Sequence, residues 1–122
     1  MPFISDTALD AALTQVANAT RMDICSTEPA TYTEATSTYT RGNKTSISLG
    51  AAGDGTPNGR KRTVPAVTDG TVTGTGTVGF WALVQVTGSV LWSTGALAAS
   101  QAVTSGNTWA TGAFDIRFAD AT

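Results

Sequence analysis

The stretch "GTVTGTGTVGFWALVQV", residues 70–86, decides the fold. Its first half alternates Thr with Gly or Val, which is typical of a β-strand. Residues 80–84 are apolar on both faces, so we expect them at the centre of a sheet or sandwich, covered on both sides. The overlapping stretch "QVTGSVLW" predicts a hairpin that turns at Thr87 and Gly88.

The chain after this hairpin predicts one more turn and one more strand. The turn falls at "SGN", residues 105–107. The segment "TWATGAFDIRF", residues 108–118, then alternates, with Phe114, Ile116 and Phe118 on the inner face. This alternation predicts a half-exposed final strand.

The N-terminal part predicts one helix over residues 6–18. Ser5 or Asp6 is expected to cap it, because a short side-chain oxygen accepts a hydrogen bond from a free backbone N–H of the first turn. One narrow face of the helix is apolar, and we expect it to pack on the chain's own sheet or on another subunit. This face consists of Leu9, Leu13 and Val16.

Residues 21–49 predict a strand followed by a Thr-rich arm. The strand covers residues 21–25, which alternate, and the chain leaves it by Pro29. Residues 30–45 are rich in Thr, whose β-branched side chain favours extended backbone. We therefore expect a β-ribbon or an extended arm that lies over the sheet or over a neighbouring chain. A short strand is expected at residues 45–49.

The next segments predict a loop and then the main sheet. Residues 50–60 are expected to form a flexible surface loop, because Gly and Asn-Gly favour positive φ. Residues 61–118 are expected to form the main sheet. Its first strand, over residues 62–68, is interrupted by Pro65, which marks an edge or a bulge.

Length and composition favour one β-rich domain over residues 1–122. Charged residues make up 13% of the chain, about half the usual share. Small and β-branched residues replace them, which favours short strands and turns. The sequence predicts a mainly β fold, a β-sandwich of about six to eight short antiparallel strands with one N-terminal α-helix. The expected core consists of Ile24, Val72, Phe80, Ala82, Leu83, Val84, Leu91, Trp92, Phe114, Ile116 and Phe118.

Few groups in this sequence suit catalysis. There is no His, the commonest general base and metal ligand. The single Cys25 lies in an alternating strand and is expected to be a buried, unreactive thiol, with an inter-chain disulfide as the alternative. We expect no catalytic, cofactor-binding or metal-binding residues and no cofactor. Spacing alone leaves open a facing carboxylate pair among Asp23, Glu28, Glu34, Asp69, Asp115 and Asp120.

The charge distribution argues against several partners. The net charge is −2 and no broad basic field exists, so we expect neither a nucleic acid nor a membrane as partner. The N-terminus has no basic region followed by a long apolar run, and it is not expected to be a signal peptide. The basic run at residues 60–62 predicts a solvated strand start or an ion-pairing contact with an acidic neighbouring protein.

Three blocks of the sequence resemble a known family. They are "FISDTALD" at residues 3–10, "ICSTEPATYTEATSTYTRGNK" at residues 24–44 and "LAASQAVTSGNTW" at residues 97–109. The chain resembles a group of small structural proteins of tailed bacteriophages, from Phe3 to Ile116. Arg41 departs from the pattern, which has an apolar residue before "GNK".

The resemblance implies a non-enzymatic structural protein of the virion, assembled in the cytoplasm of the host bacterium. We expect a capsid decoration or cement protein that is present in many copies or as a homo-oligomer and binds neighbouring capsid subunits. Two alternatives stay open: a neck, collar, tail or fibre component, and a glycan- or receptor-binding module that uses Trp81, Trp92 or Trp109. The expected interaction residues are Tyr32, Tyr39, Arg41, Lys44, Arg60, Lys61 and Arg62.

Overall fold

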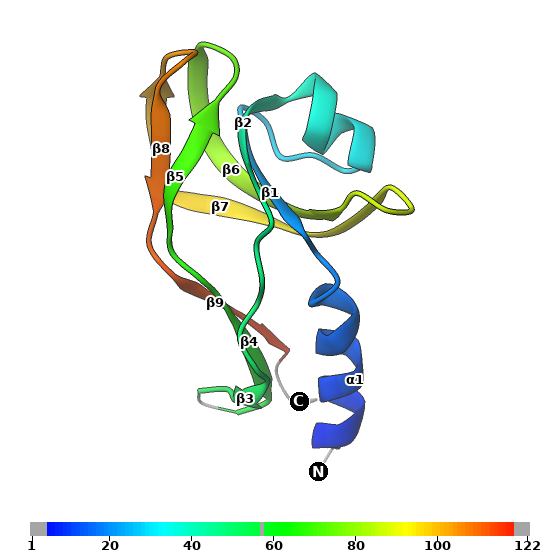
Figure 1. Ribbon diagram of the computed structural model, residues 1–122. Helices are drawn as coiled ribbons and strands as arrows, with labels where there is room; N and C mark the ends of the chain where they lie inside the picture. The colour runs from blue at the N-terminus through cyan, green and yellow to red at the C-terminus, as the bar shows by residue number, and fades with distance from the viewer. Residues whose placement is uncertain (1–4, 57, 119–122) are drawn as a thin grey trace.

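The computed structural model describes residues 5–56 and 58–118 and is mainly β, with one N-terminal helix (Figure 1). In chain order the elements are α1 (Asp6–Val16), β1 (Arg21–Cys25), the π-helical turn η1 (Glu34–Thr38), β2 (Thr40–Thr45), β3 (Gly53–Asp54), β4 (Arg60–Val64), β5 (Val67–Val72), β6 (Gly76–Gln85), β7 (Val90–Val103), β8 (Thr108–Thr111) and β9 (Phe114–Phe118). The predicted mainly β, sandwich-like fold is confirmed. Among the described residues, only the two-residue β3 takes the number of strands beyond the predicted range.

The strands form two antiparallel sheets. The larger sheet has the order β7-β6-β1-β2-β5-β8, and the smaller has the order β3-β4-β9. The larger sheet is curled, and register shifts in its ladders contribute to the curvature. Its edge strands β7 and β8 are joined by the predicted turn at residues 104–107, where the Gly106 N–H donates to the Val72 carbonyl over 3.0 Å. The sheet therefore nearly closes on itself at this end.

A long two-stranded ribbon connects the two sheets. β4 and β5 form one strand of it, and β8 and β9 form the other, with Val64 opposite Phe114 and Val67 opposite Thr111. Both strands break at the same level, and Pro65 supplies the break on one side, as predicted. The single final strand predicted over residues 108–118 is therefore wrong: it divides into β8 and β9, which belong to different sheets.

The helix packs on the chain's own small sheet. The Ser5 hydroxyl accepts a hydrogen bond from the Ala8 N–H over 3.2 Å, which confirms the predicted cap. The predicted apolar face, Leu9, Leu13 and Val16, is buried. α1 contacts β4, so packing within the chain explains this face (Figure 1). The helix ends two residues earlier than predicted.

The central strand β6 is covered on both faces, as its sequence predicts. Leu83 faces the main core, which also contains Leu13 and Ile24. Ala82 and Val84 face a second, smaller cluster on the other side of the sheet. All three β6 residues are fully buried. The hairpin to β7 turns over residues 86–89, where Gly88 adopts a φ of 87°.

The first part of the Thr-rich arm lies over the sheet, and there the predicted extended conformation is wrong. The last residues of the arm are extended, as β2. Residues 32–38 are helical and end in the π-helical turn η1, whose Ala35 packs on the second cluster. A local capping arrangement explains the difference. The Thr31 hydroxyl accepts from the Glu34 N–H over 3.1 Å, and the Glu34 carboxylate accepts from the Ala30 N–H over 2.8 Å. This is close to a capping box, which favours a helix start over extended backbone.

The strand predicted over residues 45–49 is also wrong. The strand lies earlier, at β2, inside the segment assigned to the arm. It ends where Ser46 adopts a φ of 59°, which interrupts extended backbone. Ile47 and Leu49 are nevertheless buried, because the irregular chain after Ser46 packs them into the main core.

Most of the predicted core is buried. Ile24, Val72, Ala82, Leu83, Val84 and Ile116 are confirmed. The larger members sit at the edges of the two clusters and are half-buried: Phe80, Leu91, Trp92, Phe114 and Phe118. The prediction missed several deeply buried residues, among them Met22, Val64 and Trp109.

Arg60 ties the helix to the small sheet. Its guanidinium donates to both carboxylate oxygens of Asp10 in α1, over 2.8 and 3.1 Å, and also pairs with Asp54 of β3. The hydrogen bonds from Arg60 hold the pKa of the Asp10 carboxyl below its ordinary value of 3.8. This contribution to stability is therefore present above that value and is lost as the pH falls through the lowered pKa.

We expect Leu83→Ala to lower the free energy of unfolding by about 2–5 kcal/mol, because it leaves a cavity in the main core. Denaturant titration of the purified chain measures this change. Val86→Ala, at a side chain that is 49% exposed, serves as the control and should cost less than about 0.5 kcal/mol. Similar losses in the two variants would contradict the assignment of the core.

We expect Arg60→Gln to lower the melting temperature at pH 7, because Asp10 loses its ion pair. The difference from the unchanged chain should shrink at pH values well below 3.8, where the Asp10 carboxyl is protonated in both proteins. Thermal melts at the two pH values test this. A difference that is the same at both would show that Asp10 does not mediate the effect.

Candidate functional site

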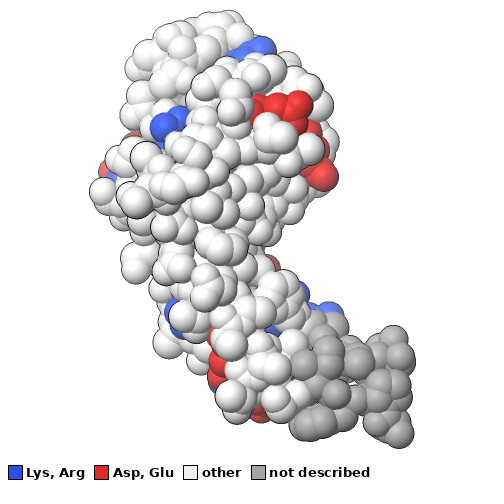
Figure 2. Space-filling view, turned by 90° about the vertical axis from the view of Figure 1, so that its right-hand side faces the viewer, with Lys and Arg blue, Asp and Glu red and all other residues white. Residues whose placement is uncertain are grey.

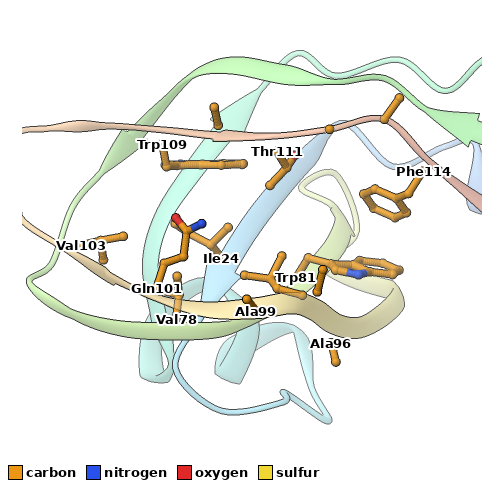
Figure 3. Close-up of a pocket in the computed structure, with 15 residues that line it drawn as sticks. Ile24, Val78, Trp81, Ala96, Ala99, Gln101, Val103, Trp109, Thr111 and Phe114 are labelled. Atoms are coloured by element: carbon orange, nitrogen blue, oxygen red, sulfur yellow. The ribbon is translucent and has the colours of Figure 1, made fainter.

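A cleft of about 620 Å³ lies at the seam between β7 and one side of the two-stranded ribbon, the side formed by β8 and β9 (Figure 3). We call it the seam cleft. Trp109 and Phe114 lie on the ribbon side, and Trp81, Val78 and Ala99 lie on the opposite side. The size is within the range of small-ligand and peptide sites.

Trp109 is held in place by two glycines. Its indole lies across Gly70, directly opposite in the ladder, and against Gly42, and a Cβ at residue 70 would overlap the ring. The indole N–H donates to the Thr71 carbonyl over 3.1 Å, and the residue is only 6% exposed. Trp109 is therefore a fixed wall of the cleft.

The opposite wall is built in the same way. Trp81 lies across Gly95, its partner in the β6–β7 ladder, where an added Cβ would approach ring carbon Cζ2 to 2.6 Å. Its ring also contacts the Phe114 ring, with centroids 4.7 Å apart and planes inclined by 43°. This aromatic pair joins β6 to β9 at one end of the cleft.

The polar groups of the seam cleft are few and uncharged. The Gln101 side chain projects into the space below Trp109 (Figure 3). The Thr111 hydroxyl oxygen is buried and makes no hydrogen bond within the described part of the chain. None of the described residues that line the cleft is charged or has a nucleophilic thiol. The cleft is therefore suited to an uncharged group.

The seam belongs to a charge-free part of the sequence. No Asp, Glu, Lys or Arg occurs between Asp69 and Asp115, a segment that contains β6, β7 and β8. On the face shown in Figure 2, the charged side chains gather towards the two ends of the molecule and the middle is largely uncharged. This gap was not recognised from the sequence, although a plot of charge along the chain reveals it.

β7 presents an open edge beside the cleft. It pairs with β6 on one side, and no described strand pairs with its other side. Its ladder is interrupted between the pairs Val78–Gln101 and Phe80–Ala96, so that residues 97–100 bulge out opposite Gly79 alone. Most of the outer half of β7, residues 96–103, is exposed to solvent.

The basic run predicted for interactions makes ion pairs and a backbone hydrogen bond within the chain. Arg60 binds Asp10 and Asp54, as described above. Lys61 pairs with Asp115 over 3.0 Å, and Arg62 donates to the Gly50 carbonyl over 3.0 Å. These contacts favour the interpretation of a solvated strand start.

The other predicted interaction residues lie on the large sheet, away from that run. Tyr32 and Tyr39 flank η1 and pack against the second cluster. Arg41 donates to the Thr40 carbonyl over 3.0 Å, and Lys44 pairs with Asp69 over 3.0 Å. The seven residues therefore do not form one surface, and their role in binding stays a prediction.

Most of the described candidate groups for catalysis are paired or buried; Glu28 is exposed, and the Glu34 carboxylate accepts from the Ala30 N–H. Cys25 is fully buried behind η1, and burial raises its pKa to about 12, which leaves it a protonated thiol. Asp23 is also fully buried and accepts hydrogen bonds from Arg21 and Thr40. Burial raises the pKa of its carboxyl above the ordinary value, although these hydrogen bonds lower it in part. Asp69 and Asp115 are ion-paired, and Asp120 lies outside the described residues.

Two features are absent from residues 5–56 and 58–118. Within them, no three His, Cys, Asp or Glu side chains come together in a way that would hold a metal ion. In the same residues, no helix has the length and apolarity needed to cross a membrane.

Comparison with known proteins adds no assignment: no family model, curated protein or solved structure matches the chain. The geometry of the seam and the sequence itself therefore carry the functional argument.

We expect Gly70→Ala to displace Trp109 and to lower the free energy of unfolding by about 1–3 kcal/mol, the usual cost of overpacking. The tryptophan emission should also shift to longer wavelength as the indole becomes exposed. Gly53→Ala is the control, because nothing lies within 4 Å of a Cβ there. If the emission of the Gly70→Ala variant is unchanged, the seating of Trp109 on Gly70 is wrong.

Proposed function

We propose that the protein is a non-enzymatic structural component of a tailed-bacteriophage virion, a capsid decoration protein that binds neighbouring capsid subunits. The observation that carries this proposal is the open edge of β7, a strand of 14 residues with no charged side chain and no proline. An exposed edge of this kind is a template for pairing with another strand. Binding through backbone hydrogen bonds is a recurrent mode of protein recognition.

The distribution of charge supports use in many copies. A decoration protein stands close to identical neighbours, and like charges on facing surfaces would oppose such packing. The charge-free segment between Asp69 and Asp115 avoids this repulsion. The resemblance of residues 3–116 to small structural proteins of tailed phages points to the same role.

The side chains near the seam also favour binding over catalysis. The polar groups identified at the cleft are the Gln101 amide and the Thr111 hydroxyl. Neither is acidic or basic near neutral pH. A surface built from strand edges, aromatic rings and neutral polar groups suits a stable contact with another protein.

The glycan-binding alternative has less support. It relies on tryptophan faces that stack on sugars, but Trp109 is only 6% exposed. The Trp92 N–H is engaged by the Gln85 side chain over 3.1 Å. Trp81 contacts Phe114. Sugars also need many polar partners, and the seam cleft offers few.

The number of copies in purified particles tests the proposal. A decoration protein should be present in roughly hundreds of copies, because closed shells repeat each contact by symmetry. Quantitative mass spectrometry of particles against a labelled internal standard measures this number. A ring of about six or twelve copies would instead identify a neck, collar or tail component. Absence from the particles would refute both roles.

A further inference from the structure

We propose that the open edge of β7 pairs antiparallel with β7 of a second copy of this chain, so that two copies form a twofold dimer with one continuous sheet. This inference rests on the proposed function and deepens it, because it assigns the open edge to the contact between neighbouring copies and leaves the contact with capsid subunits to other surfaces of the chain.

The outer edge of β7 has backbone groups that no neighbouring strand pairs, among the residues that the structure describes. β7 stands at the end of the six-stranded order and pairs with β6 only, among the strands that the structure describes. Residues 97–100 bulge out opposite Gly79 and have no ladder partner on β6 either. Backbone N–H and C=O groups are strong donors and acceptors, and an added strand satisfies them.

β7 lacks the features that usually protect an exposed edge strand from pairing with another chain. Exposed edge strands commonly carry lysine, other charges or proline, which prevent pairing with another chain. β7 carries none of these over residues 90–103. The bulge at residues 97–100 shortens the regular ladder. Most of the side chains in this bulge are small, so its unpaired backbone is accessible. Ala98, Ala99 and Ser100 are exposed and leave room for a second backbone.

The neutral sequence of β7 favours a second copy of this chain as the partner of the open edge. Antiparallel pairing about a twofold axis places each strand opposite itself, so any charge near the axis would meet a like charge. The neutral sequence of β7 satisfies this condition. A charged partner strand would lose hydration without gaining an opposite charge, because no charged residue occurs between Asp69 and Asp115. The edge is therefore compatible with itself and unsuited to a charged partner.

The seam cleft provides an apolar surface beside the open edge of β7. A strand added to the open edge of β7 lies on the side of β8, next to the cleft (Figure 3). The cleft then supplies apolar contact for the side chains of the added strand. It also offers the Gln101 amide and the Thr111 hydroxyl, which has no hydrogen-bond partner within the described residues. Pairing therefore covers both the open backbone and the open cleft.

Sedimentation of the purified full chain tests the pairing. Over a range from about 1 µM to about 1 mM, we expect a concentration-dependent dimer, and Ala98→Lys should weaken it at least about tenfold. The reason is that the proposed pairing places the twofold axis at the bulge of residues 97–100, where the ladder partners on β6 are missing, so the two lysines meet. Thr45→Lys is the matched control, because Thr45 is also an exposed strand residue but lies on β2. It should leave the dimer unchanged.

A second variant covers the case in which Ala98→Lys fails to fold. Ala98→Cys should form a covalent dimer when it is oxidised with copper phenanthroline, since the proposed pairing is centred on the bulge at residues 97–100 and brings the two residues 98 together. Thr45→Cys should stay monomeric under the same conditions. The native Cys25 does not interfere, because its thiol is buried. Denaturing gels without reductant give the result.

The outcomes separate this inference from the proposed function. A chain that remains monomeric and forms no cross-link overturns the pairing, even if the chain is abundant in particles or binds another capsid protein. A dimer that Ala98→Lys and Thr45→Lys weaken equally also overturns it, because the contact then lies elsewhere. A dimer with the expected behaviour, in a chain that is absent from particles, supports the pairing and refutes the virion role.

Discussion

The incomplete closure of the large sheet is the constraint on which the rest of the structure depends. β7 and β8 are joined by a tight turn, yet no ladder joins them, and the sheet remains open along their edges. An open edge has unpaired backbone groups, and a curled sheet with an open seam leaves part of its inner face uncovered. The seam cleft, the open edge of β7 and the absence of charge around them are three aspects of this opening.

Rigid walls beside the seam keep the opening from collapsing. Trp109 lies on Gly42 and Gly70, and Trp81 lies on Gly95. In each case a large ring covers a residue without a side chain, so the ring fills the space that the glycine leaves. The opposite end of the molecule is organised differently, by the ion pairs of Arg60 and Lys61 around the small sheet and α1. Ion pairs therefore tie the small sheet to α1, whereas uncharged packing shapes the walls of the seam.

Local patterns in the sequence predicted much of the fold. The apolar run at residues 80–84, the cap at Ser5 and the break at Pro65 each depend on neighbours in the chain, and each was confirmed. The helical arm was missed because the Thr31–Glu34 capping signal was outweighed by the β propensity of threonine. The seam could not be predicted, since it arises from strands that meet only after the sheet has curled. Only its lack of charge was visible in the sequence.

Hydrogen–deuterium exchange of the β7 backbone amides, compared between the free chain and purified particles, tests the central claim most directly. The account predicts that exchange at residues 97–100, which have no ladder partner among the described residues, becomes much slower in the particles. Exchange in α1, which is hydrogen-bonded within itself, should change little. Equal exchange of the β7 amides in the two states would contradict the claim that this edge makes the structural contact.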